Sequence, residues 1–368
     1  MKTIKVLHCI HSLSGGGAER QLELLCNYAD QKQIENVTFC IEESGADIGA
    51  RKVTRYQRKS KLDLNIIDAI AKVIEKEQPD IVHAWVPPVV VVPALVAGWR
   101  KKVPVIVSYR TAEAFRGWLS VMEYISSLLL ASGLASNTSI SLCSTMHRFL
   151  YKLKGGVVIK NAVQVPDQYT AELTRAKRSE ILNILFVGRI TAQKNWKCLI
   201  EALAIVGDSI PWKLTMCGRG DDENLYAKAV RDNGISGKVE TLGYRKDIYD
   251  VMTKADVMVL PSWYEGMPNV LVEAFALGLP VIASDIPSHR DILKGSEAAL
   301  LFQPYSAQEL ADKIISLYHN PQMRDDLAVK GKRCAEEFTV GKMVSRYVDY
   351  YRTVIMHQGK GFKERVIE

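Results

Sequence analysis

Short apolar runs alternate with stretches of helical periodicity along most of the chain. The opening run IKVLHCI (4–10) leads into a glycine turn and then into apolar residues at helical spacing between Leu22 and Tyr28. Strands of about four to eight residues that alternate with helices of about 10–15 residues are typical of parallel sheets built from strand–helix–strand units. In the first half, further strands are predicted at 36–41, 80–85, 103–109, 136–141 and 157–163, and helices at 64–77, 89–99 and 118–134.

The alternation breaks at 166–180 (PDQYTAELTRAKRSE), and we predict that this segment is a linker. The pattern restarts at ILNILFVG (181–188) and continues toward the C-terminus. We therefore predict an α/β fold with two doubly wound, Rossmann-like parallel-sheet domains, at 1–165 and 181–341, that face a central cleft. Ligands of such sheets bind beyond the carboxyl ends of the strands, so the loops that follow strands are the candidate sites.

Composition narrows the class of protein. The 368 residues fit two or three domains, and 48% apolar with 24% charged residues is a globular composition, which excludes collagen-like, disordered and coiled-coil chains. Seven cysteines without a C-x-x-C pair argue against a disulfide framework and a structural zinc, and favour the reducing cytosol. Lys5 and two histidines interrupt the N-terminal apolar run, so we expect no signal peptide. The longest uncharged stretch, 81–99, contains three prolines and predicts a strand followed by a helix, not a membrane span.

The positive charge is concentrated in the first half. Residues 1–180 hold 24 basic and 17 acidic residues, whereas residues 181–368 hold 24 of each, and the net charge is +7. The stretch between Asp47 and Asp63 contains six basic residues and no acidic residue. It suggests that the first domain meets an anionic membrane or an anionic acceptor, although a solvated loop would have the same composition. The charge is modest and lacks interleaved aromatic residues, which argues against nucleic acid. The basic residues of this stretch are Arg51, Lys52, Arg55, Arg58, Lys59 and Lys61.

Two loops carry groups that suit an anionic ligand. Gly15, Gly16 and Gly17 follow the first strand and open a helix, so that backbone N–H groups can approach an anion, or simply form a tight turn. Gly188 and Arg189 end a strand, and Lys194 lies five residues later. A bidentate arginine and a lysine point charge suit a diphosphate, whereas a solvated surface pair is the alternative.

The third loop is EGMPNVLVE (265–273), which runs into a helix. Gly266 leaves room for a ligand, and the first-turn N–H groups can bind phosphate oxygens. Glu273 lies in an apolar helix, where a carboxylate needs a hydrogen-bond partner such as a ribose diol, unless it lies on the helix surface. Glu265 can reach a sugar hydroxyl. Two carboxylates also permit a glycosidase, but Glu273 inside a helix is poorly placed as a nucleophile.

Together these loops resemble the retaining glycosyltransferases of family 4, the group 1 transferases of the GT-B fold. The resemblance rests on EGMPNVLVEAFALGLPVIASD, VGRITAQKN, SLSGGGAER and KNAVQVP, which together extend along nearly the whole chain. It implies that Arg189 and Lys194 neutralise the donor diphosphate, Glu265 contacts the transferred sugar and Glu273 holds the ribose. It also implies that the C-terminal helix, about 342–368, packs back on the first domain. Further implied donor-binding positions are Gly218, Gly220, Tyr244, Arg245, Met267, Asn269 and Val270.

The chain departs from the family pattern at several positions. Many members of the family have a His-x-His pair after the fourth strand, and this chain has His83-Ala84-Trp85 at that place. His83 is therefore either a candidate contact to the donor sugar or a packed core histidine. Asn161-Ala162 stands where Asn-Gly is frequent, and Asp291 where glutamate is frequent. These departures affect the sugar and acceptor specificity rather than the phosphate-binding set.

The resemblance implies a retaining enzyme that moves a sugar from a nucleotide-sugar, with UDP favoured, to a hydroxyl of a glycan or lipid-linked acceptor in bacterial polysaccharide synthesis. We expect no metal, because two cations and a helix N-terminus can stabilise the leaving diphosphate. A cytoplasmic protein, peripheral on the inner face of the membrane, is expected. Another GT-B enzyme, such as a UDP-sugar epimerase or a phosphorylase, and a non-catalytic nucleotide-sugar-binding protein are the alternatives.

Overall fold

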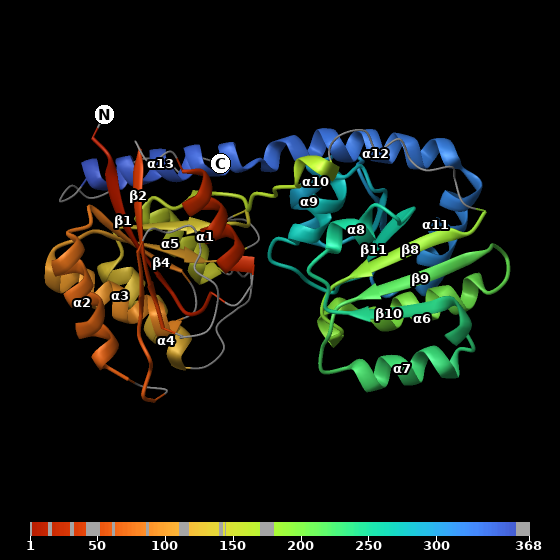
Figure 1. The fold of residues 1–368 in the computed structure, drawn as a ribbon, viewed down its shortest axis with the longest axis horizontal. Helices are drawn as coiled ribbons and strands as arrows, with labels where there is room; N and C mark the ends of the chain where they lie inside the picture. The colour runs from red at the N-terminus through yellow and green to blue at the C-terminus, as the bar shows by residue number, and fades with distance from the viewer. Residues whose placement is uncertain are drawn as a thin grey trace. The chain divides into compact units, whose positions relative to one another are not determined.

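A computed structural model describes residues 2–13, 17–29, 33–41, 52–60, 63–85, 88–109, 118–139, 143, 145–169 and 180–357. The chain forms two compact units, drawn in Figure 1: residues 1–162 with 340–368, and residues 163–339. The predicted linker, 166–180, belongs to the second unit, and its residues 170–179 lie outside the described ranges. Val163 N–H donates to Phe338 O, so the two chain crossings between the units lie side by side.

The first unit is built on a parallel sheet whose order is β3-β2-β1-β4-β5-β6-β7. β2 and β3 lie on one side of β1, and β4 to β7 lie on its other side. The direction in which the chain adds strands therefore reverses between β1 and β4. The strands are β1 Ile4–Ile10, β2 Ile34–Cys40, β3 Lys52–Arg55, β4 Ile81–Trp85, β5 Val105–Tyr109, β6 Gly133–Ser136 and β7 Val157–Val158.

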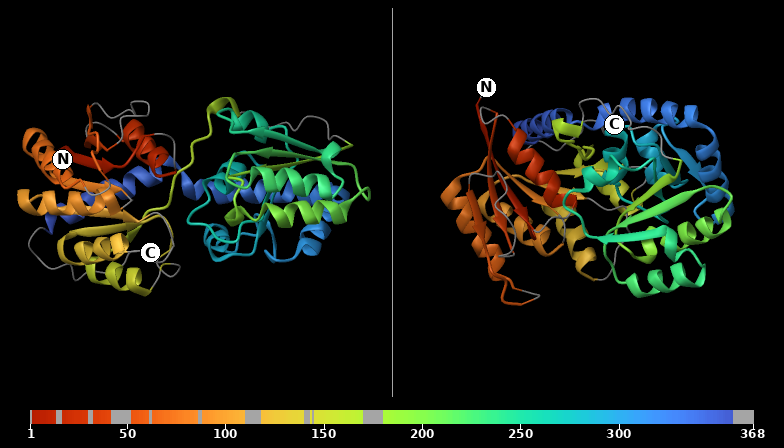
Figure 2. Two further views of the ribbon diagram at one scale, coloured as in Figure 1. Left: turned by 90° about the horizontal axis from the view of Figure 1, so that it is seen from below. Right: turned by 45° about the vertical axis from the view of Figure 1, so that its right-hand side comes forward.

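Helices cover both faces of this sheet, which buries the central strands on two sides and explains their nearly continuous apolar sequence. One face packs against α2 Asn65–Glu77, α3 Pro88–Lys101, α4 Trp118–Leu130 and α5 Thr145–Lys154. The other face packs against α1 Gly17–Tyr28 and the C-terminal α13 Val340–Met356. The return of α13 to the first unit, visible in both views of Figure 2, is the arrangement that the resemblance implied.

The second unit repeats this architecture with the order β10-β9-β8-β11-β12-β13, again entirely parallel. Its winding reverses between β8 and β11. The strands are β8 Leu182–Val187, β9 Trp212–Cys217, β10 Val239–Gly243, β11 Val257–Leu260, β12 Val281–Ser284 and β13 Leu300–Phe302.

Two helical layers enclose this second sheet as well. One consists of α6 Trp196–Val206, α7 Glu223–Asp232 and α11 Ala307–His319. The other consists of α8 Ile248–Met252, α9 Asn269–Ala276 and α10 Pro287–Leu293. Helix α12 Pro321–Ala335, which follows α11, contributes Leu327 to the first of these layers but packs chiefly against α9 of the second. The loop after β8 contains the 3-10 turn η3 Ala192–Lys194, which immediately precedes α6.

The predicted α/β fold of two parallel sheets is confirmed, and the 81–99 stretch is a strand followed by a helix. In the described part of the chain, no helix combines the length and the apolar character that a membrane span requires. All seven cysteines are free thiols, and six of them are buried.

Several local predictions were wrong: the helix predicted at 118–134 ends at Leu130, and the strand predicted at 157–163 extends only over Val157–Val158. The strand expected at 136–141 is β6 at Gly133–Ser136, where small residues pair with β5 although they give no apolar run. Helix α5 was missed, because its sequence TMHRFLYKLK mixes basic and apolar residues without a recognisable start. Within the basic stretch, for which a solvated loop was the alternative interpretation, Lys52–Arg55 forms the edge strand β3, which pairs with β2.

Candidate functional site

The point where the winding of the second sheet reverses brings two of the predicted loops together. β8 pairs with both β9 and β11, so the chain leaves β8 toward one side of the sheet and leaves β11 toward the other. Ligands in open parallel sheets bind where the connections diverge in this way. Lys194 lies in the loop after β8 and Glu265 in the loop after β11, and both loops begin at this point.

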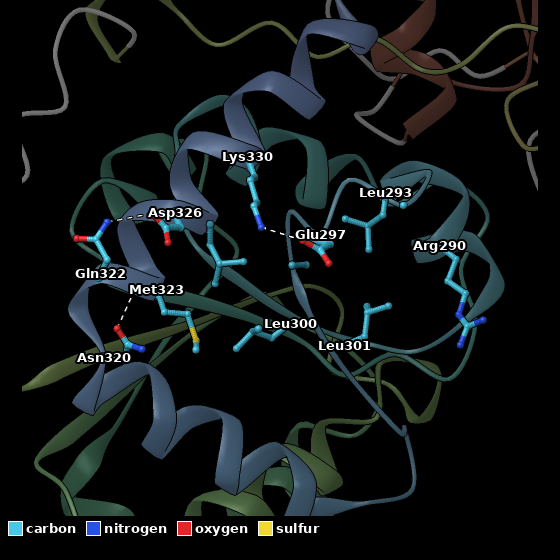
Figure 3. A pocket seen from close by; sticks show the side chains of 13 residues that line it. Arg290, Leu293, Glu297, Leu300, Leu301, Asn320, Gln322, Met323, Asp326 and Lys330 are labelled. Carbon is cyan, nitrogen blue, oxygen red and sulfur yellow. Dashed lines mark hydrogen bonds and ion pairs between the residues drawn. The ribbon is translucent and has the colours of Figure 1, made fainter.

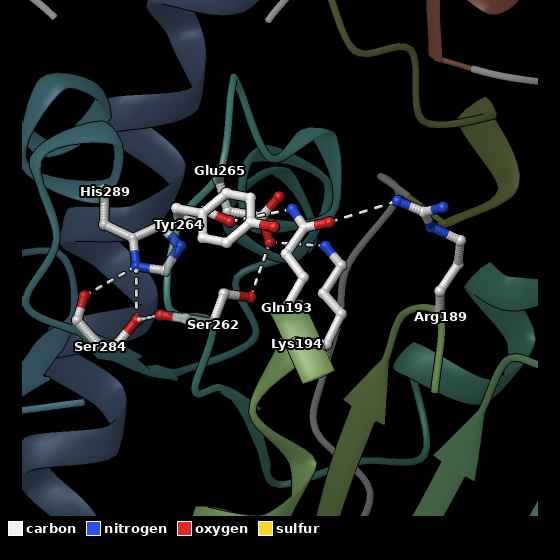
Figure 4. Close-up of polar contacts among 8 residues, drawn as sticks. All are labelled: Arg189, Gln193, Lys194, Ser262, Tyr264, Glu265, Ser284 and His289. Atoms are coloured by element: carbon white, nitrogen blue, oxygen red, sulfur yellow. Dashed lines mark hydrogen bonds and ion pairs between the residues drawn. The ribbon is translucent and has the colours of Figure 1, made fainter. Parts of the chain in front are cut away.

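Lys194 and Glu265 form an ion pair. Lys194 Nζ lies 2.5 Å from Glu265 Oε1, and Ser262 Oγ donates to the same carboxylate oxygen at 2.7 Å. The side chains of Lys194 and Glu265 are only 15% and 9% exposed, so their attraction is less screened than in a surface pair. Figure 4 shows the ammonium and the hydroxyl directed at the carboxylate of Glu265.

The two loops are also joined through Gln193. Its carbonyl accepts from Trp263 N–H at 2.9 Å, and its side-chain amide donates to Tyr264 O at 3.0 Å. The amide oxygen of Gln193 in turn accepts from Arg189 Nη2 at 3.3 Å. Arg189 is exposed and is held beside the Lys194–Glu265 pair, as Figure 4 shows. The predicted catalytic set therefore lies in two neighbouring groups of hydrogen bonds, which the adjacent residues Gln193 and Lys194 and the adjacent residues Tyr264 and Glu265 join.

Asn195 fixes the loop that carries Lys194. Its backbone φ is 51°, a left-handed conformation that asparagine tolerates better than most residues. Its buried side-chain amide donates to Pro261 O at 3.0 Å and to Pro304 O at 2.7 Å. Asn195 was not among the predicted site residues, although an asparagine between a loop and a helix is a recognisable sequence signal.

His289, on α10, is a second residue that the sequence analysis missed. It is fully buried, and its Nδ1 lies 2.8 Å from Ser284 O, a group that can only accept a hydrogen bond. Nδ1 therefore carries the proton, and Nε2 is a buried acceptor without a hydrogen-bond partner among the described residues. Burial lowers the pKa of His289, so the ring is neutral next to the Lys194–Glu265 pair.

Ser284 connects this histidine with the catalytic loop. Its hydroxyl donates to Ser262 O at 2.6 Å, and Ser262 is the residue whose own hydroxyl donates to Glu265. The chain from His289 through Ser284 and Ser262 thus ends at the carboxylate (Figure 4). No sequence signal distinguishes Ser262, Ser284 or His289 from ordinary loop residues.

The start of α9 carries the remaining predicted donor-binding positions. Pro268 precedes the helix and has no side chain that can cap it, while Gly266, Met267, Asn269 and Val270 are half-buried around it. Glu273 is 5% exposed, and Tyr249 Oη lies 3.5 Å from its Oε1. The buried position agrees with the prediction that this carboxylate is not on the helix surface.

Gly218 and Gly220 have a packing role that the sequence did not suggest. A Cβ atom on Gly218 would lie 1.8 Å from Gly188 O, and one on Gly220 would lie 2.3 Å from Ile190 O. These glycines therefore allow the loop after β9 to pack against the loop after β8. The prediction that they admit a nucleotide is untested, and close backbone packing is sufficient to explain both.

Tyr244 and Arg245 follow β10, the edge strand of the second sheet. Tyr244 is 67% exposed, and Arg245 makes a two-point ion pair with Asp247. They lie at the same end of the sheet as Arg189 but two strands away from β8. Their predicted contact with the nucleotide base stays a prediction.

Positions predicted in the first unit have different surroundings. Gly17 is the first residue of α1, and Gly16 lies outside the described residues. His83 is not at a strand end but inside β4, fully buried, with its ring nitrogens 2.8 Å from Tyr351 Oη and 2.6 Å from Ser108 Oγ. This is the environment of the packed core histidine, which was the alternative to a sugar contact.

The basic stretch is only partly described, because Arg51 and Lys61 lie outside the described residues. Lys52 Nζ lies 2.9 Å from Glu77 Oε2, so an acid from α2 compensates its charge. Arg55, Arg58 and Lys59 are half-buried or exposed near the edge of the sheet.

A cavity of about 720 Å³ lies elsewhere in the second unit. Leu293, Leu300, Leu301 and Met323 form its apolar floor, and Lys330 pairs with Glu297 at 3.0 Å on its rim (Figure 3). None of the predicted site residues lines it. Within the described residues, no cluster of three or more histidine, cysteine, aspartate or glutamate side chains is arranged to hold a metal ion.

Comparison with known proteins assigns both halves of the chain. Residues 15–162 match the sequence family Glycosyltransferase Family 4, and residues 174–333 match Glycosyl transferases group 1. LpsE of Rhizobium meliloti, a lipopolysaccharide core biosynthesis glycosyltransferase, is 24% identical over 344 residues, which are 89% of this chain and 93% of LpsE. A phosphatidyl-myo-inositol mannosyltransferase of Mycobacterium leprae is 31% identical over 203 residues, 54% of each chain. Several other curated relatives are likewise matched over about half of their length.

Similarity to solved structures extends over the whole fold. The structure of Anabaena HepE in complex with UDP superimposes with a TM-score of 0.80 at 19% identity, over 95% of this chain and 100% of HepE. At this level of identity the similarity concerns the fold.

Proposed function

Because the chain belongs to the group 1 glycosyl transferases and has the GT-B fold, we propose that it transfers a sugar from a nucleotide-diphosphate sugar to a hydroxyl group. The acceptor is a glycan or a lipid-linked glycan of bacterial polysaccharide synthesis. LpsE and the mannosyltransferase, whose names refer to a lipopolysaccharide and to a phosphatidylinositol, support an acceptor of this kind.

The observation that carries this proposal is the network of Arg189, Lys194 and Glu265 at the reversal point of the second sheet. It combines two cations with a carboxylate, all joined through Gln193 and the loop after β11. A site that only bound a sugar would have no need of two cations. A departing diphosphate needs both, because negative charge develops on its oxygen as the sugar leaves.

In the proposed reaction Lys194 changes partner. Its ammonium is held by Glu265, and an incoming diphosphate competes for the same ammonium while Arg189 binds a second phosphate oxygen. Glu265 stays anchored by Ser262 and becomes free to accept a hydrogen bond from a sugar hydroxyl. Donor binding thus converts an internal ion pair into contacts with both ends of the donor.

The other predicted residues complete the donor site in this proposal. The first-turn N–H groups of α9 face the phosphates, and the helix dipole favours negative charge there. Glu273, buried and near Tyr249, accepts hydrogen bonds from the ribose hydroxyls. UDP is the proposed nucleotide, and the UDP complex of HepE is consistent with that choice.

We propose a retaining mechanism without a metal ion. The acceptor hydroxyl attacks the anomeric carbon on the face from which the diphosphate leaves, and a phosphate oxygen takes the hydroxyl proton. The C–O bond to the diphosphate breaks as the new glycosidic bond forms, so no protein base is required. Activity should persist in excess EDTA, and NMR of the product should show the anomeric configuration of the donor; loss of turnover in EDTA would reject metal independence.

Nucleotide binding by calorimetry tests the proposal directly. UDP, GDP and ADP are titrated in EDTA into the wild type, Lys194→Met and Lys228→Met. Lys228 is an exposed lysine on α7 that pairs with Asp232, so its replacement removes a charge without touching the site. We expect UDP to bind the wild type most tightly and Lys194→Met at least about tenfold more weakly, with Lys228→Met unchanged.

The outcome separates the remaining alternatives. Equal UDP affinity of Lys194→Met and wild type would remove Lys194 from the diphosphate site. Conversion of the donor sugar without an acceptor would indicate an epimerase. Tight binding without turnover on any acceptor would favour a non-catalytic binding protein.

Peripheral membrane association also belongs to the proposal. A lipid-linked acceptor lies in a bilayer, so its hydroxyl is reached from the membrane surface. The sequence suggests the basic stretch 51–61 for this contact, with a solvated loop as the alternative, and residues 52–60 of it are described. A vesicle-binding comparison of the wild type with serine variants of Arg55, Arg58 and Lys59 tests that surface.

A further inference from the structure

Three fully buried polar residues lie behind the Lys194–Glu265 pair. Ser262, Ser284 and His289 are 1%, 0% and 0% exposed, and they come from the loop after β11, the end of β12 and helix α10. Apolar side chains of similar size would fill the same space, whereas a buried polar group costs free energy unless it is hydrogen-bonded. The three residues therefore indicate a role beyond filling the core.

The hydrogen bonds of these residues run in one direction, toward the carboxylate of Glu265 (Figure 4). His289 Nδ1 donates to the carbonyl of Ser284 at 2.8 Å, and Ser284 Oγ donates to the carbonyl of Ser262 at 2.6 Å. Ser262 Oγ then donates to Glu265 Oε1 at 2.7 Å. Carbonyl and carboxylate oxygens can only accept, so each donor has a fixed role. The end of β12 and the loop after β11 are thus held against each other, and the last donor ends on Glu265.

Glu265 depends on these bonds once the donor is bound. Among the described residues its Oε1 has two partners, Lys194 Nζ at 2.5 Å and Ser262 Oγ. In the proposed reaction the diphosphate draws Lys194 away, so Ser262 is the contact that keeps the carboxylate in place. A serine hydroxyl can hold a direction only if its own loop is fixed, and the bond from Ser284 to the carbonyl of Ser262 fixes it.

The ring of His289 suits this task because it is neutral. Burial lowers its pKa, so the ring adds no third cation beside Lys194 and does not compete for the charge of Glu265. Its Nε2 is buried without a hydrogen-bond partner among the described residues, which an apolar side chain would avoid. The value of a histidine at this position therefore lies in the bond that its Nδ1 makes.

We propose that His289 is a positioning residue for recognition of the transferred sugar. Through Ser284 and Ser262 it holds Glu265 in the orientation in which the carboxylate accepts a hydrogen bond from a sugar hydroxyl. The inference rests on the proposed function, in which Glu265 meets the sugar while Lys194 meets the diphosphate. His289 itself touches neither part of the donor, since its ring is fully buried. Its replacement therefore affects the binding of the sugar and not that of the nucleotide.

Calorimetry with UDP and with a UDP-sugar separates these two contributions. UDP-glucose and UDP-N-acetylglucosamine are the probes, and the one that the wild type binds more tightly is used for the comparison. The variants are His289→Leu, which removes the donor at similar size, His289→Asn, whose amide N–H can take the place of Nδ1–H, and Ser284→Ala. Ile314→Val, in the buried side of α11, is the control for a loss of stability that leaves these hydrogen bonds intact.

We expect His289→Leu and Ser284→Ala to bind UDP as tightly as the wild type and the UDP-sugar about tenfold more weakly, because one hydrogen bond to a charged group is lost. His289→Asn should regain most of the affinity for the UDP-sugar. Urea unfolding should nevertheless show that His289→Asn is less stable than His289→Leu, because a polar side chain stays buried. A purely structural role predicts instead that affinity follows stability. Ile314→Val should bind both ligands as the wild type does.

A double-mutant cycle tests whether the effect passes through Glu265. Glu265→Ala removes the carboxylate that His289 positions, so adding His289→Leu to it should weaken binding of the UDP-sugar by less than about twofold more. In the wild-type background the same substitution should cost about tenfold. Additive losses would mean that His289 acts on the donor by a route that does not include Glu265.

Three results would overturn the positioning role while the proposed function stands. They are a His289→Leu variant that binds the UDP-sugar as the wild type does, equal losses of affinity for UDP and for the UDP-sugar, and an additive cycle with Glu265→Ala. A wild type that binds neither UDP nor a UDP-sugar would reject the proposed function, and the positioning role with it.

Discussion

The two units share one topology but differ in what they place near the reversal of their sheets. In the second unit, the loops after β8 and β11 hold the Lys194–Glu265 ion pair with Arg189 beside it. In the first unit, β1 and β4 carry buried histidines within the strands. The same strand order can therefore build a charged ligand site or a neutral packed core, according to whether polar residues follow the strands or lie within them.

These two strand histidines, His8 and His83, behave as structural groups. Trp85 Nε1 donates to His8 Nδ1 at 3.2 Å, and burial lowers the pKa of His8 to about 4, so the ring is neutral at physiological pH. His83 bridges Ser108 and Tyr351, and Tyr351 belongs to α13. These contacts fasten the C-terminal helix to the first sheet.

The largest expected effect comes from the charged site. Arg189→Ala removes an exposed cation, so kcat should fall about 10²- to 10³-fold while the free energy of unfolding changes by less than about 0.5 kcal/mol. Steady-state kinetics and urea unfolding measure the two quantities. Arg231→Ala, at an exposed position on α7, is the matched control and should leave both unchanged. Normal turnover of Arg189→Ala would mean that this cation does not meet the diphosphate.

The opposite result is expected in the core of the first unit. His83→Leu leaves the hydroxyls of Ser108 and Tyr351 buried without their histidine partner, which should lower the free energy of unfolding by about 2–4 kcal/mol. Tyr351→Phe should cost about 1 kcal/mol. kcat measured well below the melting temperature should change little. A large loss of kcat in His83→Leu with unchanged stability would instead support a contact of His83 with the donor sugar. The first unit would then also hold a ligand site near the reversal of its sheet.

The pH dependence of the free energy of unfolding gives a further test of the first unit, through the buried Glu123 of α4. Burial raises its pKa to about 7 from the 4.5 of a free glutamate, because water no longer solvates the charged carboxylate. The folded state therefore holds the proton more tightly than the unfolded state. The stabilisation is complete below about pH 4.5 and is lost as the pH rises to about 7, a change of up to about 3 kcal/mol.

Glu123→Gln should remove this pH dependence, because an amide mimics the protonated acid. Urea unfolding at pH 5 and pH 8 measures it, and Glu201→Gln on the exposed side of α6 serves as the control. The Glu123→Gln variant should be more stable than the wild type at pH 8 and similar at pH 5. Parallel pH profiles of the variant and the wild type would show that Glu123 ionises as a solvated acid.

The smallest effect is expected at Gln193, which touches Arg189 and Tyr264 without a charge of its own. Gln193→Ala removes two hydrogen bonds, each contributing about 0.5–1.5 kcal/mol, and leaves Arg189 less ordered. We expect KM for the donor to rise about threefold to tenfold with kcat nearly unchanged. Gln308→Ala, which removes an exposed contact to Asp312 on α11, should change neither. A fall in kcat instead of a rise in KM would make Gln193 part of the chemical step.

Much of the second unit could be predicted from the sequence. The apolar runs at 182–187 and 212–217 and the periodic stretch at 196–206 correspond to β8, β9 and α6. The pairing of Lys194 with Glu265 was not predictable, since 71 residues separate them and only the adjacency of β8 and β11 brings them together. His289 gave no signal either, because its importance comes entirely from burial beside that pair.

The first unit was harder to interpret, for a physical reason. β6 (GLAS) has one large apolar residue among three small ones, and β3 (KVTR) is a mostly polar edge strand, so neither shows the apolar run by which central strands are recognised. In α4 the apolar residues Val121, Ile125 and Leu129 are exposed, which the sequence did not indicate, because periodicity cannot tell which side of an almost entirely apolar helix faces the core.

Local spacing along the chain thus determined the α/β class, the alternation of strands with helices and the residue types in the loops, since these depend on neighbours a few positions apart. Which loops meet, which histidines are neutral and buried, and which apolar side chains remain exposed were decided only when the strands took their order in the sheets. That order joins residues far apart in sequence, and the burial it produces sets the strength of every charge and hydrogen bond in the site.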